Sequence, residues 1–271
     1  MYVFGGQGKG SKVFKDMHAL DLKTWTWMHV RCATAPPPAR AGHSALLMGD
    51  KIVVCGGWDL KRTFGDLWVF DTKAFSWLRP RTAGRPPTGR YGHSCELTDD
   101  GRLLIFGGYS VKLEEGRIAP RTEFLSDVRE LDTTTMEWTR PRVIGDMPAA
   151  RHSHRTCMMG LQMLSIGGWT GVPRCVLCNV EKKGGGGHDE HDIDCIVGKS
   201  LYAAPAGAGG DMAGAPRRVD FVSCLDTGSM EWFQPSFRGE PPANMQYVLG
   251  VGERARGGGE GGRGREGEGG G

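Results

Sequence analysis

The chain has 271 residues, a formal net charge of +3 from 34 basic and 31 acidic side chains, and eight cysteines. This length can bury a substantial core, and the near balance of charge makes nucleic acid an unexpected partner. No apolar run approaches the roughly 20 residues that span a bilayer, and the first ten residues lack the features of a signal peptide. We therefore expect no membrane partner, reduced cysteines and a cytoplasmic protein, with the nucleus as the alternative.

A pattern of aspartate, tryptophan, arginine and glycine recurs about every fifty residues. A tryptophan follows an aspartate by six residues at four places, an arginine follows three of these tryptophans by thirteen residues, and a Gly-Gly pair comes sixteen or seventeen residues later. Such a period predicts that each repeat is one supersecondary unit stacked on its neighbours. The residues are Asp21/Trp27, Asp71/Trp77, Asp132/Trp138 and Asp226/Trp232, then Arg40, Arg90 and Arg151, with glycine pairs beginning at Gly5, Gly56, Gly107 and Gly167.

Each unit contains short runs rich in Val, Ile, Phe and Trp, separated by Gly, Asp and Thr turns, which predict four antiparallel strands. A small sheet of this kind cannot cover its own apolar faces, whereas radial packing into a propeller covers them. The expected blade segments are 1–30, 38–80, 87–141 and 149–234, followed by a last strand at 241–250.

The first segment, 1–30, begins with the second strand of its unit. The missing first strand could come from 241–250, although Asn244 stands there in place of the expected arginine. The alternative is a partial array, which would leave a sheet edge and an apolar blade face exposed. Both alternatives stay open.

This pattern resembles the Kelch repeat in its glycine pairs at the end of the second strand, its tryptophan in the fourth strand, and its Arg-x-Gly-His opening at 40–43 and 90–93. The resemblance extends over residues 1–250. It implies an all-β fold, a Kelch-type β-propeller of four-stranded antiparallel blades, with about four blades present in a partial or complete ring. Kelch propellers usually have six or seven blades.

Two further segments have their own composition. Residues 169–217 form an insertion loop within the last unit, and residues 251–271 are almost entirely Gly, Arg and Glu. The second segment cannot bury apolar surface, so we expect a disordered tail. Its arginines are matched by glutamates, which weakens the case for RNA binding.

The repeated arginines and the loops after the glycine pairs are the predicted partner-binding residues. The connectivity of an up-and-down blade places both at the same face, and arginine and aromatic side chains are favoured in interfaces. The alternative is structural: the arginines and histidines hold the first strand, and the aromatics cover the blade. The candidate residues are Arg40, Arg90, Arg151, Trp58, Tyr109 and Trp169.

The insertion loop also contains the residue types of a zinc site. Two thiolates and two imidazoles can complete a tetrahedral shell and would order a glycine-rich loop. The spacing is tighter than in zinc fingers, and a solvated loop is the alternative. The candidate ligands are Cys175, Cys178, His188 and His191, with Cys195 nearby, and we expect no cofactor other than zinc.

No nucleophile motif, phosphate loop or zinc-protease helix is present in the sequence. The sequence therefore predicts a non-catalytic scaffold or adaptor that binds protein partners through the inter-blade and strand 2–3 loops of one propeller face. The alternative is a metal-dependent enzyme or metal-binding module that uses the 175–195 loop.

Overall fold

The computed structural model describes residues 1–112, 121–170, 222–236 and 238, and the regular structure of these residues is almost entirely β-strand, with one short 3₁₀ helix, η1 (Lys9–Ser11). The strands form four sheets in chain order, antiparallel except for one two-residue strand in each of the last two sheets. The first sheet has the order β1 (Tyr2–Phe4), β2 (Met17–Asp21) and β3 (Thr26–His29). The second has the order β4 (Ser44–Met48), β5 (Lys51–Cys55), β6 (Leu67–Asp71) and β7 (Ser76–Leu78).

The last two sheets repeat this order and each gain a fifth, two-residue strand. The third sheet contains β9 (Ser94–Leu97), β10 (Arg102–Lys112), β11 (Arg121–Asp132) and β12 (Glu137–Thr139), with β8 (Ala83–Gly84) parallel to β12. The fourth contains β14 (Arg155–Met159), β15 (Gln162–Ile166), β16 (Val222–Asp226) and β17 (Glu231–Phe233), with β13 (Ile144–Gly145) parallel to β17.

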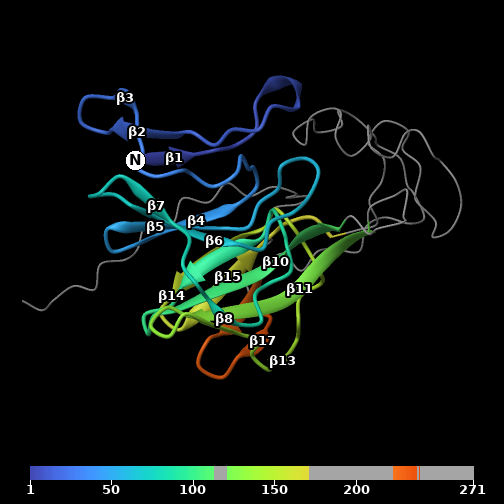
Figure 1. Cartoon of the computed structure of the whole chain (residues 1–271). Helices are drawn as coiled ribbons and strands as arrows, with labels where there is room; N and C mark the ends of the chain where they lie inside the picture. The colour runs from blue at the N-terminus through green and yellow to red at the C-terminus, as the bar shows by residue number, and fades with distance from the viewer. Residues whose placement is uncertain (113–120, 171–221, 237, 239–271) are drawn as a thin grey trace, which may run out of the picture.

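The predicted all-β, four-stranded Kelch-type blades are confirmed. Figure 1 shows the four sheets in succession, with the first at one end and β13 and β17 at the other. The boundaries of the propeller domain stay a prediction, and the last strand at 241–250, most of the 169–217 loop and the 251–271 tail lie outside the described residues.

The repeated aspartates close the turn between the third and fourth strands. Asp71 Oδ1 accepts the backbone N–H groups of Lys73 and Ala74, both at 2.9 Å. The chain then passes through Phe75 with a φ of +49° before β7 begins. Asp21, Asp132 and Asp226 accept equivalent bonds, and the residues after their turns also have positive φ. The Asp-to-Trp spacing is therefore the length of one Asx-turn hairpin.

The glycine pairs allow neighbouring blades to approach at the backbone. Gly107 has a φ of +63°, and a Cβ there would lie 2.8 Å from the carbonyl oxygen of Arg151 in the next blade. Gly108 donates its N–H to this same oxygen at 2.8 Å. Only glycine combines this conformation with so close a contact.

The core lies between the sheets and is built around the repeated tryptophans. Trp77 packs against Phe4 and Met17 of the first sheet. Trp138 packs against the second sheet through Val53 and Cys55. Trp232 packs in the same way against the third sheet, on Leu104 and Phe106. Each of these three tryptophans therefore fills the interface with the preceding blade.

The connection after the third glycine pair, between Gly108 and Asp127, differs from the loop that the sequence predicts there. The β10–β11 ladder shifts register between Phe106 and Gly108 and then continues to the pair Lys112 and Arg121. The extension is stabilised by apolar contacts, because Val111 is buried and Phe124 packs on Tyr109 with ring centroids 4.9 Å apart. A β-bulge at a glycine pair can redirect a hairpin without ending it.

Candidate functional site

Each blade that has a first strand is held by an arginine. In the third blade, Arg90 Nη1 donates to Gly107 O at 3.0 Å and to Asp127 Oδ1 at 2.8 Å. Its Nη2 donates to Asp127 Oδ2 at 3.1 Å, and its Nε donates to the carbonyl oxygen of Thr88. A planar guanidinium matches a carboxylate in this bidentate way. Arg90 thus ties the start of the first strand to the second and third strands.

The same arrangement recurs in the second blade and, in part, in the fourth. Arg40 Nη1 contacts Gly56 O at 2.8 Å and Asp66 Oδ1 at 2.7 Å. Arg151 donates to Gly167 O at 3.0 Å. The accessible fractions of Arg40, Arg90 and Arg151 are 0%, 1% and 0%. Their contact with a partner stays a prediction, and burial assigns them a positioning role within the blades.

The partner carboxylates have lowered pKa values. Burial alone would raise the pKa of Asp127, but the hydrogen bonds and charge of Arg90, assisted by Arg129, outweigh burial and lower it to about 2. The pKa of Asp66 is lowered by Arg40 in the same way against the effect of burial. Both carboxylates therefore remain ionised and paired near neutral pH.

The predicted aromatic residues lie beside the arginines, as expected from the connectivity. Trp58, Tyr109 and Trp169 each form a β-bridge to the residue that follows the arginine of their blade. Trp58 stacks on Tyr91 of the next blade, with centroids 4.6 Å apart and an interplanar angle of 13°. Trp58 and Tyr109 are buried, and Trp169 is half-buried. These rings form an inter-blade layer, and their contact with a partner stays a prediction.

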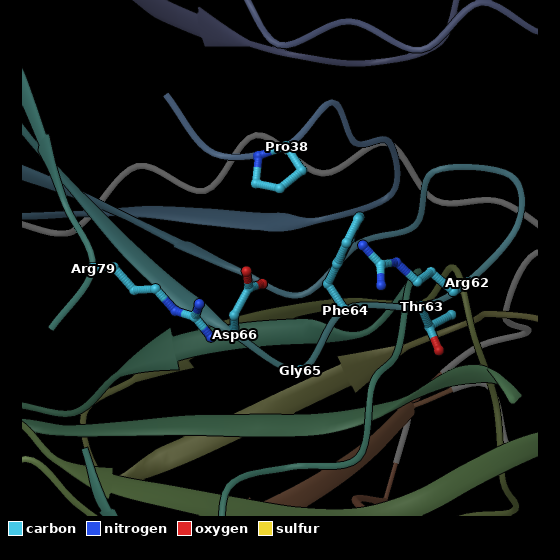
Figure 2. A pocket seen from close by; sticks show the side chains of 7 residues that line it. All are labelled: Pro38, Arg62, Thr63, Phe64, Gly65, Asp66 and Arg79. Atoms are coloured by element: carbon cyan, nitrogen blue, oxygen red, sulfur yellow. The ribbon is translucent and has the colours of Figure 1, made fainter. Parts of the chain in front are cut away.

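An open hollow of about 400 Å³ is lined in part by Asp66, the ion-pair partner of Arg40. Arg62 and Arg79, both exposed, lie on either side of it, and the Phe64 ring is at its wall (Figure 2). The Arg40 guanidinium lies 4.4 Å from the Phe64 ring centroid and that of Arg62 lies 5.5 Å from it. The lining residues are Pro38, Arg62, Thr63, Phe64, Gly65, Asp66 and Arg79.

Sequence reasoning missed the hollow and the aspartates of the arginine pairs. Asp66 is 26 residues after Arg40, whereas Asp127 is 37 residues after Arg90, because the intervening loops differ in length. A usable signal was nevertheless present: Asp66 and Asp127 each precede the Asx-turn aspartate of their blade by five residues. Asp16 precedes Asp21 by the same spacing.

A histidine directly precedes the first strand of each of the last three blades, and His93 and His154 are buried. His154 is fully buried, and its Nε2 lies 3.0 Å from Ser94 Oγ of the preceding blade. Burial, assisted by the charge of Arg151, lowers the pKa of His154 to about 3. Burial and Arg40 lower the pKa of His43 to about 4. The pKa of His93 is also well below its usual value, chiefly through burial.

We expect the free energy of unfolding to fall as the pH is lowered from about 6.5 towards 4. The unfolded histidines bind protons near pH 6.5, while the folded ones stay neutral, so stability rises with pH across this window. Where only the unfolded form of such a histidine is protonated, that histidine changes the free energy of unfolding by about 1.4 kcal/mol per pH unit. Urea unfolding at pH 7.5, 6.0 and 5.0 measures this slope, and His154→Gln should reduce it. Equal stability at all three pH values would contradict the assignment.

The candidate zinc ligands Cys175, Cys178, His188 and His191 all lie outside the described residues. Within the described part of the chain, no group of three or more His, Cys, Asp and Glu side chains could hold a metal ion. In that same part, no helix is long and apolar enough to cross a membrane.

Repeated four-stranded sheets, inter-blade tryptophans and arginine-held first strands define a β-propeller of the Kelch type. The model of the KLHDC2/KLHL20/DRC7 Kelch-repeats domain matches residues 1–168, and the chain belongs to the Kelch-repeat family.

Three curated proteins are similar in sequence to part of this chain. Acyl-CoA-binding domain-containing protein 5 of Arabidopsis thaliana is 31% identical over 183 residues, covering 66% of this chain and 19% of the relative. Acyl-CoA-binding domain-containing protein 4 of the same plant is 27% identical, covering 60% of this chain and 23% of the relative. Human host cell factor 1 is 28% identical, covering 62% of this chain and 9% of the relative. The chain thus spans less than a quarter of the length of each.

Proposed function

We propose that this chain is a non-catalytic protein-interaction scaffold whose partner binds at the hollow between Pro38 and Arg79. The observation that carries the proposal is the position of this hollow. It is formed by the inter-blade link, through Pro38, and by the strand 2–3 loop of the second blade, through Arg62 and Phe64. These are the two kinds of connection that a rigid propeller presents for recognition. Membership of the Kelch-repeat family supports the same role.

The charge of the hollow favours an acidic group on the partner. The Arg40–Asp66 pair and the Arg62–Asp59 pair are each internally neutral, which leaves the charge of Arg79. Arg62 Nε lies 3.5 Å from Asp59, at the surface. Arg79 forms no ion pair with any described residue, and its guanidinium lies 5.9 Å from the Trp68 ring centroid. A partner carboxylate can therefore pair with Arg79 while an apolar neighbour contacts the Phe64 ring.

The protonation states of buried side chains support a non-catalytic role. Burial keeps His43 and His154 neutral, and it raises the pKa of Cys157 above its usual value. Burial and the neighbouring Cys55 thiol raise the pKa of Cys95 well above its usual value. Protonated thiols are poor nucleophiles, and buried neutral imidazoles cannot readily exchange protons with a substrate.

Quantitative affinity purification with charge-reversed variants tests the proposed surface. We expect Arg62→Glu/Arg79→Glu to reduce recovery of the principal partner at least about tenfold, because both substitutions replace a positive charge beside the acidic partner group by a negative one. The matched control is Arg31→Glu/Arg140→Glu, which changes the charge equally at two exposed arginines outside the hollow. Equal recovery with both double variants would show that the hollow is not the binding surface. Absence of any partner enriched over a charge-matched unrelated protein would contradict the scaffold role itself.

A further inference from the structure

The first blade contains the acceptor half of the arginine pair. Gly5 has a φ of +63° and donates its N–H to Asp16 O at 3.0 Å, as Gly56 does to Asp66 O at 3.0 Å. Asp16 thus occupies the place that Asp66 has in the second blade.

The carboxylate of Asp16 is also held like its counterparts. The residue two positions further along the strand contacts Oδ2 in each blade: His18 Nε2 at 2.9 Å from Asp16, Trp68 Nε1 at 2.8 Å from Asp66, and Arg129 Nε at 2.7 Å from Asp127. In the second and third blades this contact leaves Oδ1 for the guanidinium. His18 therefore does not replace the missing arginine.

No guanidinium of the described residues reaches Asp16 or the Gly5 carbonyl oxygen. The Asp16 side chain is accordingly 42% exposed, against 13% for Asp66 and for Asp127. The acceptor pair is present and its donor is absent from the described part of the chain.

The edge of β1, where a strand carrying this donor would pair, has no partner among the described strands. In the second sheet, β5 pairs with β4 on one side and with β6 on the other. Within the described residues, β1 pairs with β2 only. Tyr2 and Val3 of β1 are exposed, and Trp27 is 55% exposed, whereas Trp77, Trp138 and Trp232 are 5%, 3% and 1% exposed. No described strand therefore pairs with this edge of β1, and the apolar residues beside it are exposed.

We propose that the edge of β1 binds an extended, arginine-bearing segment whose guanidinium pairs with Asp16 and the Gly5 carbonyl oxygen. The chain supplies three templates for this occupant. In each template, the residue directly before the glycine pair faces a first-strand residue, and the arginine lies four residues before that first-strand residue. Arg90, for example, lies four residues before Ser94, which faces Phe106. The other two templates are Arg40 with Ser44 opposite Cys55 and Arg151 with Arg155 opposite Ile166. In the first blade, the residue directly before the glycine pair is Phe4, so the occupant would face Phe4.

Arginine is specified over other residues by the geometry of the acceptors. A guanidinium reaches a carbonyl oxygen and a carboxylate at once, which neither an ammonium nor an amide can do in the same way. The segment 241–250, expected from the sequence to complete this blade, has Asn244 at the arginine position and supplies no such charge. The occupant is therefore defined by chemistry as an extended peptide with an arginine at its start, added by β-augmentation.

A labelled peptide with the sequence of residues 86–97, its cysteine replaced by serine, is the probe for the full chain. We expect saturable binding by fluorescence anisotropy, together with slower hydrogen exchange at residues 1–5. Asp16→Asn should weaken binding about tenfold, the size of one lost charge-assisted hydrogen-bonded contact. A peptide with glutamine in place of its arginine should weaken by a similar factor. Asp50→Asn removes the same charge from an exposed turn and should bind like the wild type.

Several results would overturn the proposal. These are absence of saturable binding, equal affinity for the arginine and glutamine peptides, and an Asp16→Asn variant that binds as tightly as the wild type. Concentration-dependent self-association that is unaffected by both Asp16→Asn and the peptide would show that a second copy covers this face instead. If Asp16→Asn unfolds at the same melting temperature as the wild type, a loss of peptide binding reflects the changed side chain and not a loss of folding.

Discussion

Replacing Trp138 by alanine should lower the free energy of unfolding by about 3–5 kcal/mol, whereas Trp27→Ala should change it by less than about 1 kcal/mol. The two tryptophans occupy equivalent repeat positions, but Trp138 is buried against Val53, Cys55 and Leu67 of the preceding blade. Trp27 has no such neighbour among the described residues and is largely exposed. The cost of truncation follows the surface and cavity created, so the same substitution has two different results.

Urea unfolding monitored by far-UV circular dichroism measures both variants against the wild type. Trp77→Ala is the matched control. The Trp77 side chain fills the interface between the first and second blades, so its removal should cost about as much as that of Trp138. Large losses for Trp138→Ala and Trp27→Ala alike would show that the face of the first blade is covered. Small losses for both would contradict the inter-blade packing itself.

The contrast between these tryptophans shows what the sequence can predict about the fold. The Asp-to-Trp spacing predicts a hairpin wherever it occurs, because an Asx turn and a fourth strand are local structures. Burial of the tryptophan is not local, since it depends on which sheet lies opposite. Trp27 and Trp138 are therefore equivalent as residues of a repeat and different as parts of a core.

The candidate site was predictable to the same extent. The proximity of each arginine to the aromatic residue after the glycine pair follows from strand connectivity, and the bridge between Tyr91 and Tyr109 has this arrangement. The burial of Arg90 was not predictable from spacing, because its partner Asp127 follows a loop of variable length. The hollow beside Arg62 and Arg79 was missed because Arg62 lies in a loop whose length differs between the units, although Arg79 has a counterpart in Arg140.

Replacing Arg90 by alanine should lower the free energy of unfolding by about 3–5 kcal/mol, the usual cost of leaving one member of a buried ion pair alone. The substitution removes the two Arg90 donors to Asp127 and leaves the Gly107 carbonyl oxygen without its side-chain donor. Arg129 remains beside Asp127, but it contacts only Oδ2. The measurement is urea unfolding at pH 7.5, where Asp127 is ionised because its pKa is about 2.

A double-mutant cycle separates the ion pair from general packing. Arg90→Leu/Asp127→Leu should cost less than the sum of the two single substitutions, because the double variant has no unpaired charge to bury. Arg90→Lys should be intermediate, since an ammonium cannot reproduce the bidentate contact with Asp127 and the bond to Gly107 together. Additive single substitutions would show that the arginine acts through packing of its aliphatic part. Its repeated pairing with an aspartate would then have no role in holding the first strand to the blade.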